Sequence, residues 1–164
     1  FLSGRSSDSP GATWALEALA GGVGKPGSDA SAGERTSTMS SIDNALPRYS
    51  LLRHTGAPDD PSGCHYDLLL EDGDSCRTWR LADIPTADGS SQNATALPAH
   101  RLVWLEPRHA AVSGNRGWAE RVMAGCYDGE LPRDPSKPVE IRLVAGDLLG
   151  TLQISNGRCC VTRT

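Results

Sequence analysis

One short segment of the chain, His65-Tyr66-Asp67, places an imidazole and a carboxylate two residues apart. On a β-strand, side chains two positions apart point to the same face, so these two groups would lie side by side. His54 precedes them by one loop, residues 55–64, which can bring it to the same place. Two histidines and one carboxylate form a ligand set that suits a divalent transition metal such as manganese, zinc or iron(II). By spacing alone, a solvated or mutually hydrogen-bonded pair is the commoner outcome.

The elements that must position these residues are short β-strands. Apolar and β-branched runs separated by Gly, Pro, Asp and Asn recur after Pro47, with little helical periodicity. This pattern predicts a mainly β protein, a compact closed or partly open β-barrel with few or no helices. Residues 83–99 contain Pro, Gly, Ser and Asn and predict a loop. We expect strands over residues 48–54, 65–71, 76–81, 100–106, 118–123, 125–127, 139–144 and 148–154.

The first 45 residues differ from the rest in composition. They are rich in Gly, Ser, Ala and Asp, which predicts a disordered or non-native N-terminal extension, residues 1–45, before a domain at 46–164. Residues 12–20 are the one candidate for a short helix there. The first residues lack the basic and apolar regions of a signal peptide. Met39 is the expected translation start.

The net negative charge of the chain argues against binding along an extended stretch of nucleic acid. Of 16 basic and 20 acidic residues, 3 and 5 precede Leu46, which leaves 13 and 15 and a net charge of −2 in the predicted domain. Proteins that hold nucleic acid through many phosphates are usually basic. A nucleic-acid role would therefore depend on a local patch or on a terminus alone. The arginines on predicted strands, ordinarily solvated, are the candidates for such a patch: Arg77, Arg80, Arg101 and Arg121.

The cysteines indicate a reducing compartment. There are five of them, an odd number, and no two have the Cys-x-x-Cys spacing of a zinc site. We interpret them as reduced thiols of a cytoplasmic protein. No stretch approaches the roughly 18 consecutive apolar residues that a membrane-spanning helix needs, so no membrane partner is expected.

The wider pattern resembles the 3′-phosphoesterase domain of the bacterial end-joining enzyme DNA ligase D, over about Arg48 to Ile154. That family has an Arg-Tyr strand ending in His, a His-Tyr-Asp-Phe-Arg-Leu-Glu strand, a Ser-Trp strand and a later His followed four residues on by Tyr. The residues that match are Arg48-Tyr49 with His54, the run His65-Tyr66-Asp67-Leu68-Leu69-Leu70-Glu71, Trp79, and His100 with Trp104. A Gly-rich piece at 114–127 and a closing hairpin that contains residues 149–152 follow in the same order.

The resemblance implies a β-barrel with a crescent-shaped groove and a manganese-dependent activity. That activity trims 3′-phosphates and 3′-ribonucleotides from DNA ends during repair, beside separate ligase or end-joining proteins. The family's metal ligands fall on His54, His65 and Asp67, and its phosphate-engaging histidine, the expected catalytic residue, falls on His100. A nearby histidine can stabilise charge at phosphorus or transfer a proton. Candidate substrate-binding residues are Trp104, Arg77 and Arg101.

Two departures from the family pattern bear on activity. The arginine two residues after the aspartate is Leu69 here, which cannot make a bidentate phosphate contact. The later tyrosine is Trp104, which donates one N–H and cannot act as an acid. These changes favour an alternative, a non-catalytic relative that binds nucleic acid or a protein through the same groove. A further alternative, an iron oxygenase, accounts for the three ligands and not for the rest of the pattern.

Overall fold

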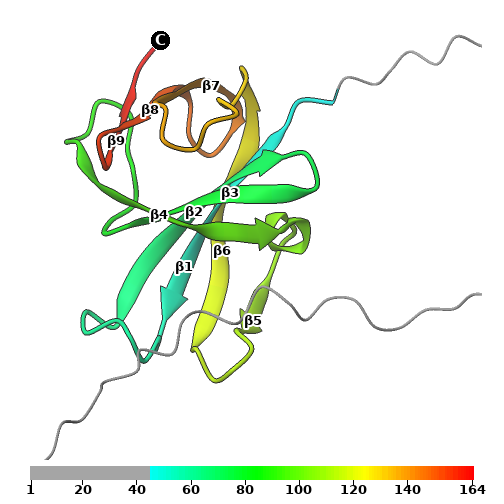
Figure 1. The fold of residues 1–164 in the computed structure, drawn as a ribbon, viewed down its shortest axis with the longest axis vertical. Coiled ribbons are helices and arrows are strands. Elements are labelled where there is room, and N and C mark those ends of the chain that lie inside the picture. The colour runs from blue at the N-terminus through cyan, green and yellow to red at the C-terminus, as the bar shows by residue number, and fades with distance from the viewer. Residues whose placement is uncertain (1–44) are drawn as a thin grey trace, which may run out of the picture. The chain divides into compact units, whose positions relative to one another are not determined.

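A computed structural model describes residues 45–164. The predicted extension at 1–45, except Ala45, and with it the helix at 12–20 and the expected start at Met39, lies outside the described residues. Nine β-strands and one 3-10 helix make up the described chain (Figure 1). They are β1 (Arg48–Thr55), β2 (Cys64–Asp72), β3 (Ser75–Leu81), β4 (Gln92–Arg101), η1 (Leu102–Leu105), β5 (His109–Ala111), β6 (Trp118–Asp128), β7 (Val139–Gly146), β8 (Gly150–Ser155) and β9 (Arg158–Thr162).

The strands form a closed antiparallel barrel, as the sequence predicts. Their order is β1-β2-β3-β4-β9-β8-β7-β6, and β1 also pairs with β6, which closes the eight-stranded ring. β5 pairs with the outer stretch of β6 and stands outside the ring. Closure removes the free edges that an open sheet would expose. Within residues 45–164 there is no helix long and apolar enough to cross a membrane.

The interior of the barrel is the main core. Alternate residues of each strand point inward, and β7 shows this with buried Val139, Ile141 and Leu143 separated by exposed residues. All eight ring strands contribute buried residues to one cluster, among them Tyr49, Leu68, Trp79, Ala94, Tyr127, Ile141, Leu152 and Cys159. Burial of this apolar surface is the main source of the fold's stability.

A second apolar cluster lies on the outer face of β1, β2 and β3. It contains Leu52, Leu69 and Cys76, whose positions alternate with those of the barrel core, and it includes Leu105 of η1 and Ala119 of β6. The 3-10 helix therefore acts as a cover over part of the outside of the barrel. The same face also carries the predicted metal ligands, His54 of β1 and His65 and Asp67 of β2, farther along these strands.

Several strand boundaries differ from those expected. Residues 92–99, predicted as loop, belong to β4, whose side chains are mostly exposed and so lack the apolar alternation of a buried strand. Residues 102–105, predicted as strand, form η1. The two strands predicted at 118–127 are one strand, β6, with irregular register on both sides. β9 was not predicted; it pairs with β8 through the turn at Asn156-Gly157.

Candidate metal centre

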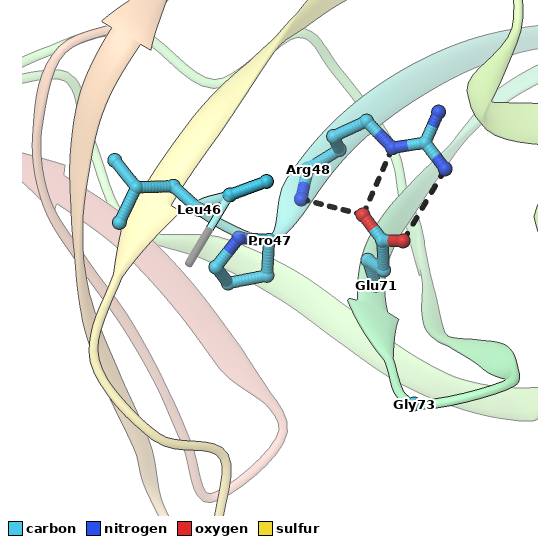
Figure 2. A pocket seen from close by; sticks show the side chains of 6 residues that line it. Leu46, Pro47, Arg48, Glu71 and Gly73 are labelled. Atoms are coloured by element: carbon cyan, nitrogen blue, oxygen red, sulfur yellow. Dashed lines mark hydrogen bonds and ion pairs between the residues drawn. The ribbon is translucent and has the colours of Figure 1, made fainter. Parts of the chain in front are cut away.

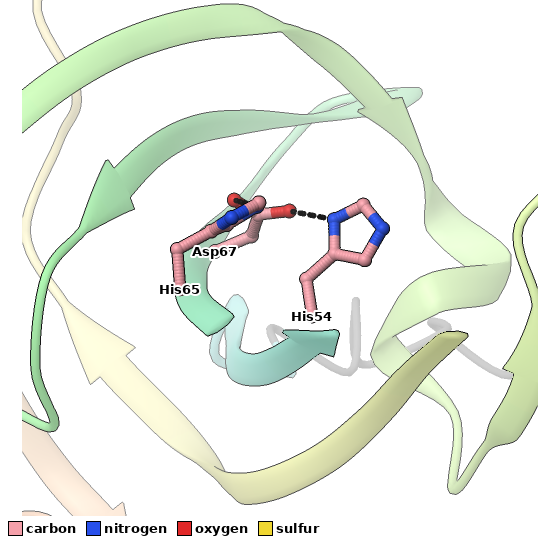
Figure 3. A group of neighbouring side chains, drawn as sticks. All are labelled: His54, His65 and Asp67. Carbon is pink, nitrogen blue, oxygen red and sulfur yellow. Dashed lines mark ion pairs between the residues drawn. The ribbon is translucent and has the colours of Figure 1, made fainter. Parts of the chain in front are cut away.

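The three predicted ligands come together where β1 ends and β2 begins. His54 pairs with His65, and Leu52 pairs with Asp67, so the two histidines and the aspartate occupy one corner of the outer face. Their ligand atoms all lie within 4.8 Å of one another (Figure 3). The i and i+2 spacing of His65 and Asp67 produces this arrangement, as expected for a strand. The cluster could hold a metal ion.

The orientation of His65 is fixed by a carboxylate behind it. Nδ1 of His65 lies 2.5 Å from Oδ2 of Asp60, in the loop between β1 and β2. Asp60 is in turn held by the backbone N–H and the hydroxyl of Ser62. These bonds, that of Ser62 first and that of His65 next, lower the pKa of Asp60 to about 2. An ionised Asp60 accepts a hydrogen bond from Nδ1–H of His65, which leaves Nε2 as the ring nitrogen that can bind a ligand.

His54 is oriented in the same manner by a backbone carbonyl. Its Nε2 lies 2.7 Å from the carbonyl oxygen of Arg116, in the turn between β5 and β6, so Nε2 is the donor and Nδ1 carries the lone pair of the neutral ring. Gly117 allows this turn to approach β1. A Cβ there would stand 2.0 Å from the carbonyl oxygen of Thr55, and the residue has a φ of +86°. Only glycine fits both conditions.

The two free nitrogens converge on one carboxylate. Nδ1 of His54 lies 3.7 Å from Oδ2 of Asp67, and Nε2 of His65 lies 3.6 Å from Oδ1. Nitrogen and oxygen ligands about 2.0–2.2 Å from a tetrahedral ion are separated by about 3.4 Å. Nε2 of His65 and Oδ1 of Asp67 are buried and make no hydrogen bond to any residue between 45 and 164. A cation between them would satisfy both atoms, so the donor set fits a divalent metal.

The charges at this corner favour a cation. The Asp67 carboxylate is the main cause that raises the pKa of His54 above its ordinary value, against the desolvation of the buried ring. A metal ion would bind in competition with that proton, because the ligand must be the neutral imidazole. The side chains of His54, His65 and Asp67 are only 11%, 4% and 7% exposed, which limits competition from water.

The expected catalytic histidine lies elsewhere on the surface. His100 pairs with Cys76 on β3, while Asp67 faces Arg80, four residues farther along the same strand. Four strand residues correspond to about 13 Å. The Nδ1 of His100 is 3.0 Å from the carbonyl oxygen of Pro98. The structure therefore does not bring His100 into the three-residue cluster.

The predicted substrate-binding residues are also dispersed. Trp104 of η1 packs against the outer apolar cluster, with the Arg108 guanidinium 5.3 Å from its ring centroid. Arg77 binds Asp72 and the carbonyl oxygen of Pro132 through its guanidinium. Arg101 is exposed at the end of β4, opposite Ser75.

Leu69, two residues after Asp67, is a packing residue. Its side chain is fully buried in the outer cluster, beneath the cover formed by η1. The position two residues after Asp67 thus contributes to packing, and a charged side chain there would lose its solvation.

A separate pocket of about 480 Å³ lies at the other end of β2 (Figure 2). Its charged wall is the Arg48–Glu71 pair, and Glu71 accepts hydrogen bonds from the backbone N–H, Nε and Nη2 of Arg48. Residues 45–47 and Gly73 complete the lining. Because these charges already satisfy one another, the chemistry of the molecule is better sought at the histidine cluster.

The groups that orient the two histidines escaped the sequence analysis. Asp60 stands in a polar loop, where an Asp-Pro-Ser turn is ordinary, and the carbonyl of Arg116 has no signature in sequence at all. A scan against protein-family models and a search of curated proteins found no match. The candidate site therefore stands on its geometry.

Proposed function

We propose that residues 46–164 are a metal-dependent phosphoesterase-like domain that processes the 3′ ends of DNA in repair. The substrate would be a 3′-phosphate or a 3′-terminal ribonucleotide, and the cofactor Mn²⁺. One observation carries this proposal. Two histidines, each fixed through one ring nitrogen, direct the other nitrogen at one buried carboxylate. The order of motifs along the chain, similar to the DNA ligase D phosphoesterase domain, supplies the reaction class.

The chain's own residues would divide the work as follows. His54, His65 and Asp67 would hold the ion, while Asp60 and the Arg116 carbonyl keep the two imidazoles oriented. A bound divalent ion supplies polarisation of a phosphoryl oxygen and a lowered pKa for water. The net charge of −2 favours recognition of a DNA end over a grip along a duplex. We place the protein in the cytoplasm, beside separate ligase or end-joining proteins.

A direct test combines metal binding with end processing. The full chain is titrated with Mn²⁺ and incubated with a primer-template that ends in a 3′-phosphate or in a single ribonucleotide. We expect His65→Ala to abolish both metal binding and product. His109→Ala is the matched control, because His109 is exposed on β5 outside the cluster and should leave both unchanged. Unchanged Mn²⁺ affinity in His65→Ala would refute the ligand assignment.

The second candidate is a non-catalytic relative that binds nucleic acid or a protein partner. Burial of Leu69 and packing of Trp104 against the apolar cluster favour it, because neither residue is free to handle phosphate. This candidate predicts DNA binding that persists in the presence of a chelator and in His65→Ala. Turnover by the wild-type protein that disappears with chelator would exclude it.

A further inference from the structure

Arg80 of β3 stands beside the candidate metal centre. It pairs directly with Asp67 across the β2–β3 ladder, so its side chain leaves the same outer face. Its Nη1 lies 4.0 Å from Oδ2 of Asp59, the neighbour of the Asp60 that orients His65. The guanidinium therefore reaches over the loop that lines the cluster. Its positive charge also acts on His54, where it opposes the rise in the pKa of that imidazole.

The hydrogen-bonding capacity of Arg80 is largely unused. Its Nε is buried and donates to no residue of the described domain. The side chain is 33% exposed, and its one ionic contact is with Asp59, whose side chain is 72% exposed. Arg77 and Arg121, by comparison, each direct a guanidinium N–H to a backbone carbonyl. Arginine presents a planar fork of donors that matches phosphate, and within the described residues no hydrogen bond engages this guanidinium, so its unused donors are a feature to be explained.

The balance of charge changes when the centre is loaded. Without metal, three carboxylates, those of Asp59, Asp60 and Asp67, face the single positive charge of Arg80. A divalent cation between the neutral histidines would cancel the remaining negative charge. The corner would then accept an anion with one of its oxygens at the metal and others at the guanidinium. An anion would be repelled before the metal binds.

We propose that Arg80 is the phosphate-binding residue of this centre and that the substrate group it recognises is a phosphate oxyanion held jointly with the metal. This inference rests on the proposed metal centre and adds to it the group that engages the substrate. It assigns the anion contact to β3, on the strand beside Asp67, in place of His100 or Arg101.

The experiment measures two ligands on the full chain. Mn²⁺ binding is followed by the electron paramagnetic resonance of the free ion, and inorganic phosphate by the ³¹P relaxation that protein-bound Mn²⁺ causes. In Arg80→Gln we expect Mn²⁺ affinity to be equal or higher, because a repelling charge is gone. Phosphate affinity should fall by about tenfold or more, since charge-assisted hydrogen bonds are lost. Arg80→Lys keeps the charge without the fork and should fall between the two.

Arg53→Gln is the matched control. Arg53 precedes His54 on β1, is paired with Glu120 and points to the opposite face of the strand. Its replacement therefore removes one positive charge from the neighbourhood of the centre without removing a group that faces it. Its phosphate affinity should equal that of the wild type. Circular dichroism establishes that each variant is folded, and Arg80→Lys decides the question if Arg80→Gln is not.

The outcomes separate this inference from the proposed function. Phosphate that binds equally well to Arg80→Gln, or no phosphate relaxation in the Mn²⁺-loaded wild type, would overturn the role of Arg80 and leave the metal centre intact. An equal loss in Arg53→Gln would overturn it as well, by showing a general effect of charge. A wild-type chain that binds no Mn²⁺ would overturn both.

Discussion

The outer face of β2 carries two carboxylates, Asp67 and Glu71, and the two make different contacts. Glu71 accepts three hydrogen bonds from Arg48, which also contacts Glu106. Asp67 leaves Oδ1 without a hydrogen bond from the rest of residues 45–164 and faces two imidazole nitrogens at 3.6 and 3.7 Å. A carboxylate with a matched arginine is a structural group. A buried carboxylate without one carries a desolvation cost, which a bound cation would offset.

Leu69 separates these two regions on the same strand face. It lies between Asp67 and Glu71 and is fully buried under η1. Along this one strand face, the ligand cluster is therefore followed by apolar packing and then by the Arg48–Glu71 ion pair. A strand alternation assigns all of these side chains to one face. The alternation does not predict which of these side chains is buried, because η1, which packs over Leu69, is distant in the sequence.

The largest expected effect on the free energy of unfolding comes from truncating Leu69, the apolar residue between Asp67 and Glu71. Leu69→Ala should lower the free energy of unfolding by about 2–5 kcal/mol, because it leaves a cavity beneath η1. Urea denaturation measures this, and Leu69→Met, which conserves volume, should cost under about 1.5 kcal/mol. The folded fraction of Leu69→Ala should still bind Mn²⁺. Loss of binding without loss of stability would show that Leu69 belongs to the ligand region.

The sequence was sufficient for the parts of this face that depend on local spacing. The class of fold followed from recurrent short apolar runs, and the meeting of His65 and Asp67 followed from the period of a strand. β4 was missed because its side chains are mostly exposed, and η1 was predicted as strand because Leu102–Leu105 is a continuous apolar run. Asp60 and Arg116 act through tertiary contacts made by loops, and no pattern in a single sequence predicts such contacts.

A smaller effect is expected at the ligand end, and its sign depends on the metal. With Mn²⁺ at a hundred times its dissociation constant, the wild-type chain should gain about 2.7 kcal/mol in its free energy of unfolding. Asp67→Asn should lose this gain. Without metal, that variant should be as stable as the wild type or more so, because it removes a buried charge whose Oδ1 makes no hydrogen bond within residues 45–164. Thermal unfolding with Mn²⁺ and with chelator measures both states. A destabilised metal-free Asp67→Asn would make Asp67 a structural group like Glu71.

The smallest change in the free energy of unfolding is expected at the Arg48–Glu71 ion pair, where the change should also depend on pH. The side-chain hydrogen bond from Arg48 is the main cause that lowers the pKa of Glu71 below its ordinary value. A lowered folded-state pKa contributes stability above the unfolded value, about 4.3, and that stability disappears as pH falls through the folded value. Glu71→Gln should therefore cost about 1 kcal/mol at pH 7, since the pair is partly solvated.

The difference between Glu71→Gln and the wild type should shrink below about pH 4 as the wild-type carboxylate becomes protonated. Glu106→Gln is the control, because Glu106 shares Arg48 but is 58% exposed, and it should change stability by less than about 0.5 kcal/mol. Neither variant should alter Mn²⁺ affinity, since both lie at the opposite end of the face from His54 and His65. A Glu71→Gln chain that loses metal binding would mean that the two ends of β2 are coupled through Leu69, and the division drawn between them would fail.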